Sequence, residues 1–340
     1  MTDVIQPVAL KPKDFATDQE VRWCPGCGDY AILAGVQRAL AKQGLPPHQI
    51  ATVAGIGCSS RFPYYMATYG FHSIHGRAPA IATGLKIARP DLQVWMATGD
   101  GDSLSIGGNH FIHLLRRNVD IKVLLFNNRI YGLTKGQYSP TSEFGKKTKS
   151  TPLGSVDNPF NPVSLAIGAE ASFIARTIDV DAKTSADVFA AAAAHHGTAF
   201  IEILQNCNIF NDGAWDHLAA KEHRAEATIT LEHGKPMIYG AARDKGIVLK
   251  GLTPQVVRIG VDGVTEADLW VHDAYDVDPT RTFLLSRMEW PHFPVPIGLL
   301  RAVQKPVYDE LMNAQTASQR LTKKADLQRL LTGNKSWVVA

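Results

Sequence analysis

Residues 93–128 read QVWMATGDGDSLSIGGNHFIHLLRRNVDIKVLLFNN. Two short apolar runs, 93–98 and 121–126, have the length and composition of buried strands, and residues 106–117 between them have the apolar periodicity of a helix. A strand, a helix and a second strand in this order form a right-handed crossover that brings two parallel strands side by side. The segment therefore predicts a parallel sheet in which Gly99-Asp100-Gly101 and Asn127-Asn128 follow the carboxyl ends of neighbouring strands.

The same alternation continues on both sides of this segment. Further buried strands are predicted at 50–56, 173–178 and 199–204, and amphipathic helices at 29–44, 78–88, 162–170 and 185–196. This order predicts an α/β fold, a mostly parallel sheet with helices on both faces. In such a fold, ligands bind outside the carboxyl ends of the strands.

The alternation stops after about residue 211, where prolines begin to interrupt the chain. We expect two parts: an α/β domain over residues 1–215, and a C-terminal extension over 216–340 that packs on this domain or on a partner subunit. Residues 136–162 are rich in Gly, Pro, Ser, Thr and Lys without periodicity. Because a loop of that length in a compact domain is usually functional, we expect it to cover a ligand or to contact a partner.

Composition limits the classes of function. The 340 residues hold 35 Lys and Arg against 32 Asp and Glu without a long basic run, which argues against a nucleic-acid surface. No apolar stretch approaches the roughly 18 to 20 residues that span a bilayer. Residues 1–20 are charged and lack the apolar core of a signal peptide, so we expect a cytoplasmic protein. Four cysteines in such a protein are too few for a disulfide framework, so we expect them to bind metal, to react, or to lie in the core.

The two strand-end motifs offer ligands suited to Mg²⁺. This ion prefers near-octahedral oxygen ligation and keeps phosphate oxygens and water in its shell. The Asp100 carboxylate and the Asn128 amide oxygen would supply oxygens from adjacent strands, and the neighbouring glycines would let the backbone approach a diphosphate. Either turn alone is common, but the two motifs, separated by the 25 residues 102–126, resemble the thiamine-diphosphate signature. That resemblance adds the backbone carbonyl of Ile130 as a third protein ligand.

The four cysteines form a second pattern. Cys24 and Cys27 make a Cys-x-x-Cys, which alone fits a redox pair, half of a zinc site or half of an iron–sulfur site. Cys58 and Cys207 each follow a predicted strand, so both lie at the edge of the sheet that carries the two strand-end motifs. All four thiolates would converge there if the Cys24 to Cys27 loop opens the first helix beside that edge. A redox pair accounts for only two of them, whereas zinc or a cluster accounts for all four.

Several motifs follow one another in a fixed order over about residues 20–215. They are Cys24-Pro25-Gly26-Cys27-Gly28, Gly55-Ile56-Gly57-Cys58-Ser59, Gly99-Asp100-Gly101, Asn127-Asn128 followed by Tyr131-Gly132-Leu133-Thr134, and a late lone Cys207. This series resembles the β subunits of 2-oxoacid:ferredoxin oxidoreductases. Residues 286–297 also resemble the tail of the 2-oxoglutarate-type members.

The resemblance implies thiamine-dependent oxidative decarboxylation of a 2-oxoacid, with 2-oxoglutarate, coenzyme A and succinyl-CoA as the expected substrates and product. It implies one 4Fe-4S cluster on Cys24, Cys27, Cys58 and Cys207, which passes electrons to a ferredoxin. Thiamine enzymes use two domains per cofactor and only one is recognisable, so an α subunit would supply the pyrimidine-binding domain. The positions expected to line the cofactor are Ile56, Gly57, Cys58, Ser59, Gly101, Asp102, Gly132 and Leu133.

Substrate contacts are predicted from position alone. Arg61 and Lys135 follow cofactor-lining segments, and either could pair with the distal carboxylate of 2-oxoglutarate. His75 could also reach the substrate. Three alternatives remain open: pyruvate or another 2-oxoacid as the substrate, a non-oxidative thiamine-dependent decarboxylase subunit, and zinc in place of the cluster. Zinc stays open because four cysteine ligands suit either zinc or an iron–sulfur cluster.

Overall fold

The structure, a computed structural model, describes residues 9–322, 325–337 and 339. Residues 1–8, which belong to the charged N-terminal segment 1–20, lie outside the described residues. Among the described helices, none has the length and apolarity needed to cross a membrane.

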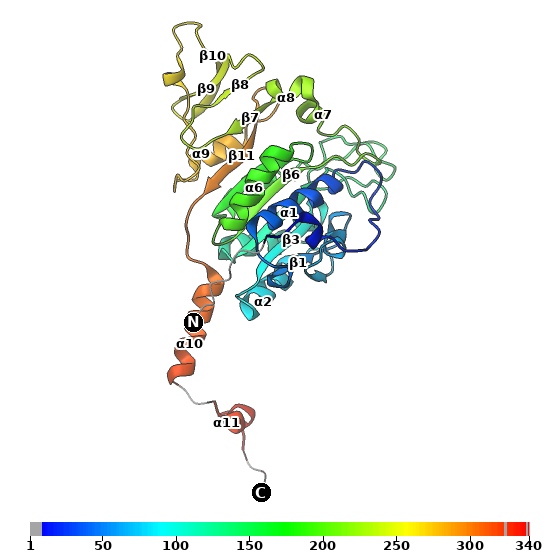
Figure 1. Cartoon of the computed structure of the whole chain (residues 1–340), viewed down its shortest axis with the longest axis vertical. Helices are drawn as coiled ribbons and strands as arrows, with labels where there is room; N and C mark the ends of the chain where they lie inside the picture. Colours follow the sequence, from blue (N-terminus) through cyan, green and yellow to red (C-terminus); the bar gives the residue numbers. More distant parts are fainter. Residues whose placement is uncertain (1–8, 323–324, 338, 340) are drawn as a thin grey trace.

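An eight-stranded sheet forms the centre of the molecule (Figure 1), with the strand order β2-β1-β3-β4-β6-β5-β11-β7. The first six strands in this order run parallel to their neighbours, β11 runs antiparallel to β5, and β7 runs parallel to β11. The predicted α/β class and the mostly parallel sheet are confirmed. The strand bounds are β1 (Ile50–Ala54), β2 (Tyr69–His72), β3 (Gln93–Gly99), β4 (Ile121–Asn127), β5 (Phe173–Ile178), β6 (Ala199–Leu204), β7 (Thr228–Leu231) and β11 (Val295–Ala302).

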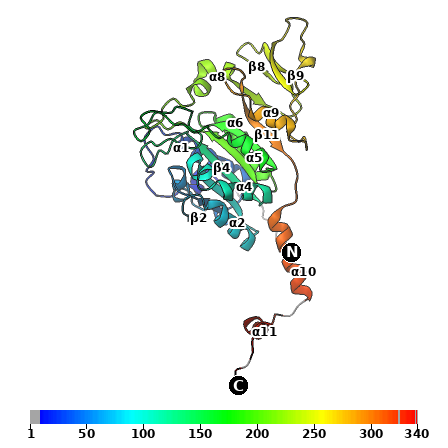
Figure 2. The same ribbon diagram turned by 180° about the vertical axis from the view of Figure 1, so that it is seen from behind.

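Helices cover both faces of this sheet (Figures 1 and 2), as the alternation predicts. On one face lie α1 (Asp29–Gln43) and α6 (Ala182–Ala194), and on the other α2 (Ala78–Ala88), α4 (Gly108–Arg117) and α5 (Pro162–Gly168). Each face has its own apolar core, with Phe189 fully buried in the first and Phe111 in the second. Burying one such side chain contributes about 1.5 to 3 kcal/mol, so both helical layers are held chiefly by these contacts.

The C-terminal part adds strands that the alternation does not predict. Strands β7 and β11 lie in the main sheet, while β8 (Ile238–Tyr239), β9 (Lys245–Lys250) and β10 (Thr253–Arg258) form a small antiparallel sheet beyond it (Figure 1). The division at residues 215 and 216 stays a prediction, but the residues after it complete one side of the main sheet. The remaining helices there are α7 (Asp216–Ala219), α8 (Lys221–Ala227), α9 (Thr280–Ser286), α10 (Tyr308–Thr322) and α11 (Leu327–Thr332), the last two projecting from the body.

The loops at the carboxyl ends of β1, β3, β4 and β6 meet at one edge of the sheet. Strand β1 ends at Ala54, two residues before its predicted end, and the turn that follows leads into a 3₁₀ helix, Ser59–Tyr65. Strand β3 runs directly into α3 (Asp100–Leu104). Residues 128–161, between β4 and α5, are described throughout and contain no helix or strand, as expected for the long loop. Other short 3₁₀ helices are Pro12–Phe15, Pro47–Gln49 and Glu266–Asp268.

Candidate functional site

Asp100 stands at the centre of the predicted magnesium site. It is the first residue of α3, and its side chain is 2% exposed. Its Oδ2 atom accepts hydrogen bonds from the hydroxyls of Ser139 and Thr141, each at 2.5 Å. Burial raises the pKa of the Asp100 carboxyl, while these two hydroxyls counteract the rise. The charged form of Asp100 thus depends on neighbours from the long loop, and a bound cation would favour it further.

The two asparagines of the second strand-end motif have different environments. Asn127 is buried, accepts a hydrogen bond from Thr141 at 2.9 Å and donates one to Glu202 at 2.8 Å. Asn128 is only half-buried, and its Oδ1 accepts a hydrogen bond from the Ile130 amide at 3.1 Å. Asp100, Asn128 and Ile130 all line one pocket. The structure therefore brings the three predicted magnesium ligands together, and their ligand role stays a prediction.

The same pocket, about 50 Å³ in volume, collects every residue that the sequence predicts to line the cofactor. These residues come from the turn after β1, from α3 and from the start of the long loop. They are Ile56, Gly57, Cys58, Ser59, Gly101, Asp102, Gly132 and Leu133.

The Asp102 carboxylate holds the segments that line this pocket together by hydrogen bonds. Its Oδ1 accepts hydrogen bonds from the amides of Ile56 at 3.1 Å and Gly76 at 2.9 Å, and lies 3.0 Å from Nδ1 of His75. Its Oδ2 accepts a hydrogen bond from the Thr98 hydroxyl at 2.9 Å. The carboxylate thus ties the turn after β1 to the magnesium motif. It also explains Gly55, where an added Cβ would stand 2.0 Å from Asp102 Oδ2.

Hydrogen bonds hold the three cysteine-bearing loops against one another. The Trp23 indole donates to the Cys58 carbonyl at 2.7 Å, which joins the first loop to the second. The Gly28 amide donates to the Asn206 carbonyl at 3.3 Å, and the Gln205 amide donates to the Cys27 sulfur at 3.3 Å. These last two bonds join the first loop to the third, which carries Cys207.

The cysteine sulfurs gather beside the cofactor pocket. A Cβ atom placed on Gly132 would lie 3.5 Å from the sulfur of Cys207 and 3.7 Å from that of Cys58. Burial raises the pKa of the Cys27 thiol and raises that of Cys58 to about 12, and the neighbouring cysteines add to both shifts. All four cysteines are free of disulfides. A metal that supplies positive charge would favour the thiolate form of Cys27 and Cys58 despite their burial.

Over residues 9–322, 325–337 and 339, no group of three or more His, Cys, Asp or Glu side chains is arranged to hold a single metal ion. A cubane cluster bonds each thiolate to a different iron, so its cysteines surround a larger body than one ion. Cluster ligation by the four cysteines stays a prediction.

Asp29 is a member of the site that the sequence did not single out. It is 1% exposed and lines the cofactor pocket, and among the described residues its carboxylate has no hydrogen-bond donor other than the neighbouring Cys27 thiol. Burial raises the pKa of Asp29 to about 7. Its place directly after Cys27-Gly28 is the only signal in the sequence, and it does not distinguish a buried acid from a surface one.

Comparison with known proteins adds independent information. Residues 54–203 match the family model described as thiamine pyrophosphate enzyme, C-terminal TPP binding domain. Over 333 residues the chain is 54% identical to the 2-oxoglutarate oxidoreductase subunit KorB of Mycobacterium tuberculosis, an alignment that covers 97% of this chain and 88% of that protein. The chain belongs to the β-subunit family of the 2-oxoacid:ferredoxin oxidoreductases. The thiamine-diphosphate-binding domain and the family predicted from the sequence are thus confirmed.

Other members of the family agree. The chain is 48% identical over 198 residues to the 2-oxoacid:ferredoxin oxidoreductase 1 subunit beta of Aeropyrum pernix, covering 58% of this chain and 62% of that one. A solved structure of the 2-oxoglutarate:ferredoxin oxidoreductase from Magnetococcus marinus, with 2-oxoglutarate, coenzyme A and succinyl-CoA bound, superposes with a TM-score of 0.73. It shares 34% identity and covers 94% of each chain.

The three predicted substrate contacts of this β subunit lie in different places. His75 lines the cofactor pocket beside Asp102. Arg61 lines a neighbouring depression together with the cofactor-lining residues Ile56 and Gly57. Lys135 is exposed and faces a different depression, so of the two cations only Arg61 adjoins the cofactor-lining turn. All three roles stay predictions.

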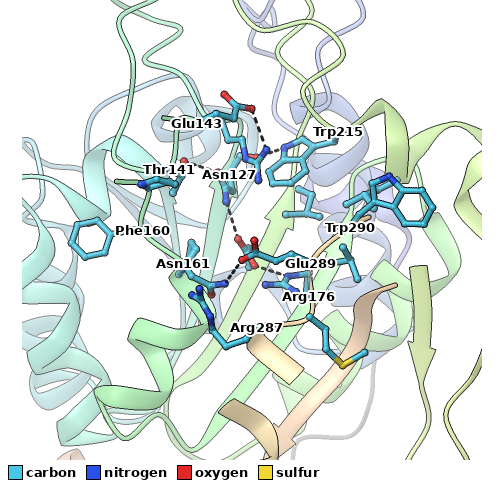
Figure 3. A pocket seen from close by; sticks show the side chains of 18 of the residues that line it. Asn127, Thr141, Glu143, Phe160, Asn161, Arg176, Trp215, Arg287, Glu289 and Trp290 are labelled. Atoms are coloured by element: carbon cyan, nitrogen blue, oxygen red, sulfur yellow. Dashed lines mark hydrogen bonds and ion pairs between the residues drawn. The ribbon is translucent and has the colours of Figure 1, made fainter. Parts of the chain in front are cut away.

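This β subunit also has a larger cavity, of about 600 Å³, that sequence analysis did not foresee (Figure 3). Asn127 of the magnesium motif lines this cavity and donates a hydrogen bond to Glu202. The Glu202 carboxylate in turn pairs with Arg176 at 2.6 Å. On its wall, the guanidinium of Arg129 lies 3.8 Å from the centre of the Trp215 ring. The walls come from segments far apart in the sequence, which is why no local pattern predicts the cavity.

Proposed function

We propose that the chain is the β subunit of an enzyme that converts 2-oxoglutarate, coenzyme A and two molecules of oxidised ferredoxin to succinyl-CoA, CO₂, a proton and two molecules of reduced ferredoxin. Thiamine diphosphate supplies decarboxylation chemistry, and a 4Fe-4S cluster on Cys24, Cys27, Cys58 and Cys207 supplies one-electron transfer. The observation that carries the proposal is the position of Gly132, which lines the cofactor pocket and lies against the sulfurs of Cys58 and Cys207. An electron acceptor at that point would be a direct neighbour of the reacting cofactor.

The chain's own residues would hold and orient the cofactor. Asp100, Asn128 and the Ile130 carbonyl would bind Mg²⁺, whose remaining ligands would be diphosphate oxygens and water. Ser139 and Thr141 orient the Asp100 carboxylate by two short hydrogen bonds. Such bonds to a metal ligand raise metal affinity because they fix its geometry.

The remaining lining residues fit a cofactor that is only half enclosed by this chain. The pocket holds about 50 Å³, whereas sites for ligands of cofactor size usually hold about 300 Å³ or more. A second wall is therefore needed, and we assign it to an α subunit that supplies the pyrimidine-binding domain and the coenzyme A site. The free cysteines suit a reducing cytoplasm, where we place the complex.

Among the candidate substrate contacts, Arg61 is supported best, because it adjoins the cofactor-lining turn. Its guanidinium would bind the distal carboxylate of 2-oxoglutarate by charge-assisted hydrogen bonds. His75 would stand near the reacting end, held by Asp102. This assignment favours a dicarboxylate over pyruvate.

The test is an anaerobic assay of the purified αβ complex with several 2-oxoacids, coenzyme A and ferredoxin. We expect ferredoxin reduction that requires coenzyme A, with kcat/KM higher for 2-oxoglutarate than for pyruvate, and none from this chain alone. A higher kcat/KM for pyruvate would refute the substrate. Decarboxylation without reduction of any acceptor would refute the oxidative reaction, and activity of the chain by itself would refute the need for an α subunit.

A further inference from the structure

A basic depression lies on the surface outside the cysteine cluster. It measures about 510 Å³, and its walls include Lys135, Lys147, Lys149, Ile209 and Phe210, here called the lysine patch. The three lysines are exposed, and so are the apolar side chains of Ile209, at 55%, and Phe210, at 38%. Exposed apolar side chains ringed by charges of one sign are typical of a surface that binds another protein.

The charges of the lysine patch are uncompensated. No ion pair within residues 9–322, 325–337 and 339 involves Lys135, Lys147 or Lys149, and no acidic residue lines the depression. The neighbouring Lys146 differs, because it hydrogen-bonds to Asn211 and lies 3.7 Å from Glu143. The patch therefore has free positive charge available for an acidic partner.

Within the lysine patch, the ring of Phe210 lies nearest to the cysteines. Phe210 follows Cys207 by three residues, and its ring lies 4.0 Å from the Cβ position of Gly132. That same Cβ position lies 3.5 Å from the Cys207 sulfur and 3.7 Å from the Cys58 sulfur. On its other side the ring packs 3.1 Å from the Cβ position of Gly136. A partner seated on Phe210 would thus be one residue away from two of the four sulfurs.

From these contacts we propose that the lysine patch is the docking surface for a small acidic iron–sulfur protein that takes electrons from the cluster. The proposal rests on the proposed function, because it needs a reduced cluster at the four cysteines. In each docking event one electron leaves the cluster and reduces the partner, and no bond or proton is transferred. Two partner molecules are reduced for each substrate oxidised by two electrons.

Two other surfaces fit such a partner less well. Cys24 is exposed, but in the depression beside its loop Asp18 and Glu20 balance the charges of Arg22 and Arg61, which leaves no net positive charge for an acidic protein. A second basic depression, which includes Lys221 and Lys235, also contains residues of β7, at the far edge of the sheet, and no cysteine lines it. The lysine patch combines free positive charge with proximity to the sulfurs.

The experiment uses the anaerobic αβ complex and the double variant Lys147→Glu/Lys149→Glu, with Lys221→Glu/Lys235→Glu as the matched control. Lys135 is left unchanged because it is also a predicted substrate contact. The acceptors are a purified acidic 4Fe-4S ferredoxin and methyl viologen, a small dication. Readouts are kcat/KM for each acceptor at low and high salt, the dissociation constant of oxidised ferredoxin without turnover, and the visible absorbance of the cluster.

At low salt we expect the first variant to lower kcat/KM for ferredoxin by at least about tenfold and to weaken ferredoxin binding similarly, with a smaller loss at high salt. Its absorbance and methyl viologen reduction should match the wild type, and the control variant should behave as the wild type throughout. Equal losses with both acceptors, an effect only in the control variant, or failure of the first variant to assemble with the α subunit would each overturn the proposal. A wild-type complex that reduces neither acceptor would instead refute the proposed function.

Discussion

The substitution Asp102→Asn tests whether this carboxylate holds the cofactor pocket together. The asparagine oxygen can keep the bonds from the Ile56 and Gly76 amides, while its amide group faces the Thr98 hydroxyl, which can turn to accept. Hydrogen bonds to a charged acceptor contribute about 1 kcal/mol more than neutral ones. Two such bonds from backbone amides and the partly exposed contact with His75 are weakened, so we expect the free energy of unfolding to fall by about 2 to 3 kcal/mol.

Asp102→Ala would leave buried donors unsatisfied, and each would lower the free energy of unfolding by about 1 to 3 kcal/mol. Together these losses would approach the whole stability of a typical domain. The asparagine variant is therefore the useful one.

The assay is urea unfolding of the chain. The difference in free energy of unfolding between wild type and variant is calculated with one common m-value, the slope against urea concentration. Hydrogen exchange of peptides that contain Ile56 and Gly76 reports on the same bonds locally, and both should exchange faster in the variant. The matched control is Asp181→Asn, because Asp181 caps α6 through the Thr184 amide at 3.1 Å and asparagine caps a helix equally well. If Asp102→Asn lowers the free energy of unfolding by less than about 0.5 kcal/mol, the range of ordinary surface changes, then Asp102 does not hold the pocket together.

Three further changes test other parts of the account. Ser139→Ala/Thr141→Val removes both hydroxyls that lower the pKa of Asp100, so Mg²⁺ affinity in thiamine diphosphate titrations should fall by about 10- to 100-fold; unchanged affinity would argue against Asp100 as a ligand. Arg61→Gln should raise the KM for 2-oxoglutarate at least about tenfold more than that for pyruvate, and equal effects would remove Arg61 from the substrate site. Burial lowers the pKa of His195 from 6.5 to about 4, so the unfolded chain takes up this proton first as the pH falls. Between pH 6.5 and 4 the wild type should lose about 3 kcal/mol more stability than His195→Gln in urea unfolding, and parallel pH profiles would contradict this.

The core of the fold could be predicted because its elements are long, buried and periodic. Strands β5 and β6 have the predicted bounds, and α2 does as well. The strands that were missed have no such signal. Strand β11 contains Pro296 and Gly298, which are unfavourable inside strands, and it is stabilised by pairing with β5 and β7, far away in the sequence. The edge strand β2 is short and exposed on both faces, so it shows no apolar run.

The site divides in the same way. Residues carried by motifs at strand ends, such as Asp100 and Cys58, could be placed from the sequence because parallel strands bring their carboxyl ends to one edge. The hydroxyls of Ser139 and Thr141 could not, since they reach Asp100 from an aperiodic loop about 40 residues away. Lys135 adjoins a cofactor-lining segment in the sequence, yet it belongs to the lysine patch, and its positive φ of 77° is a backbone feature that no sequence pattern reveals.

Metal analysis of the anaerobically purified protein distinguishes an iron–sulfur cluster from zinc at the four cysteines. We expect a brown protein with about four iron atoms per chain whose visible absorbance is bleached by dithionite. Cys207→Ser should lower the iron content, while Ala192→Ser, which also places a serine at a buried position but lies outside the cluster, should not. A colourless protein that holds zinc and no iron would contradict the cluster, and with it the electron path to ferredoxin.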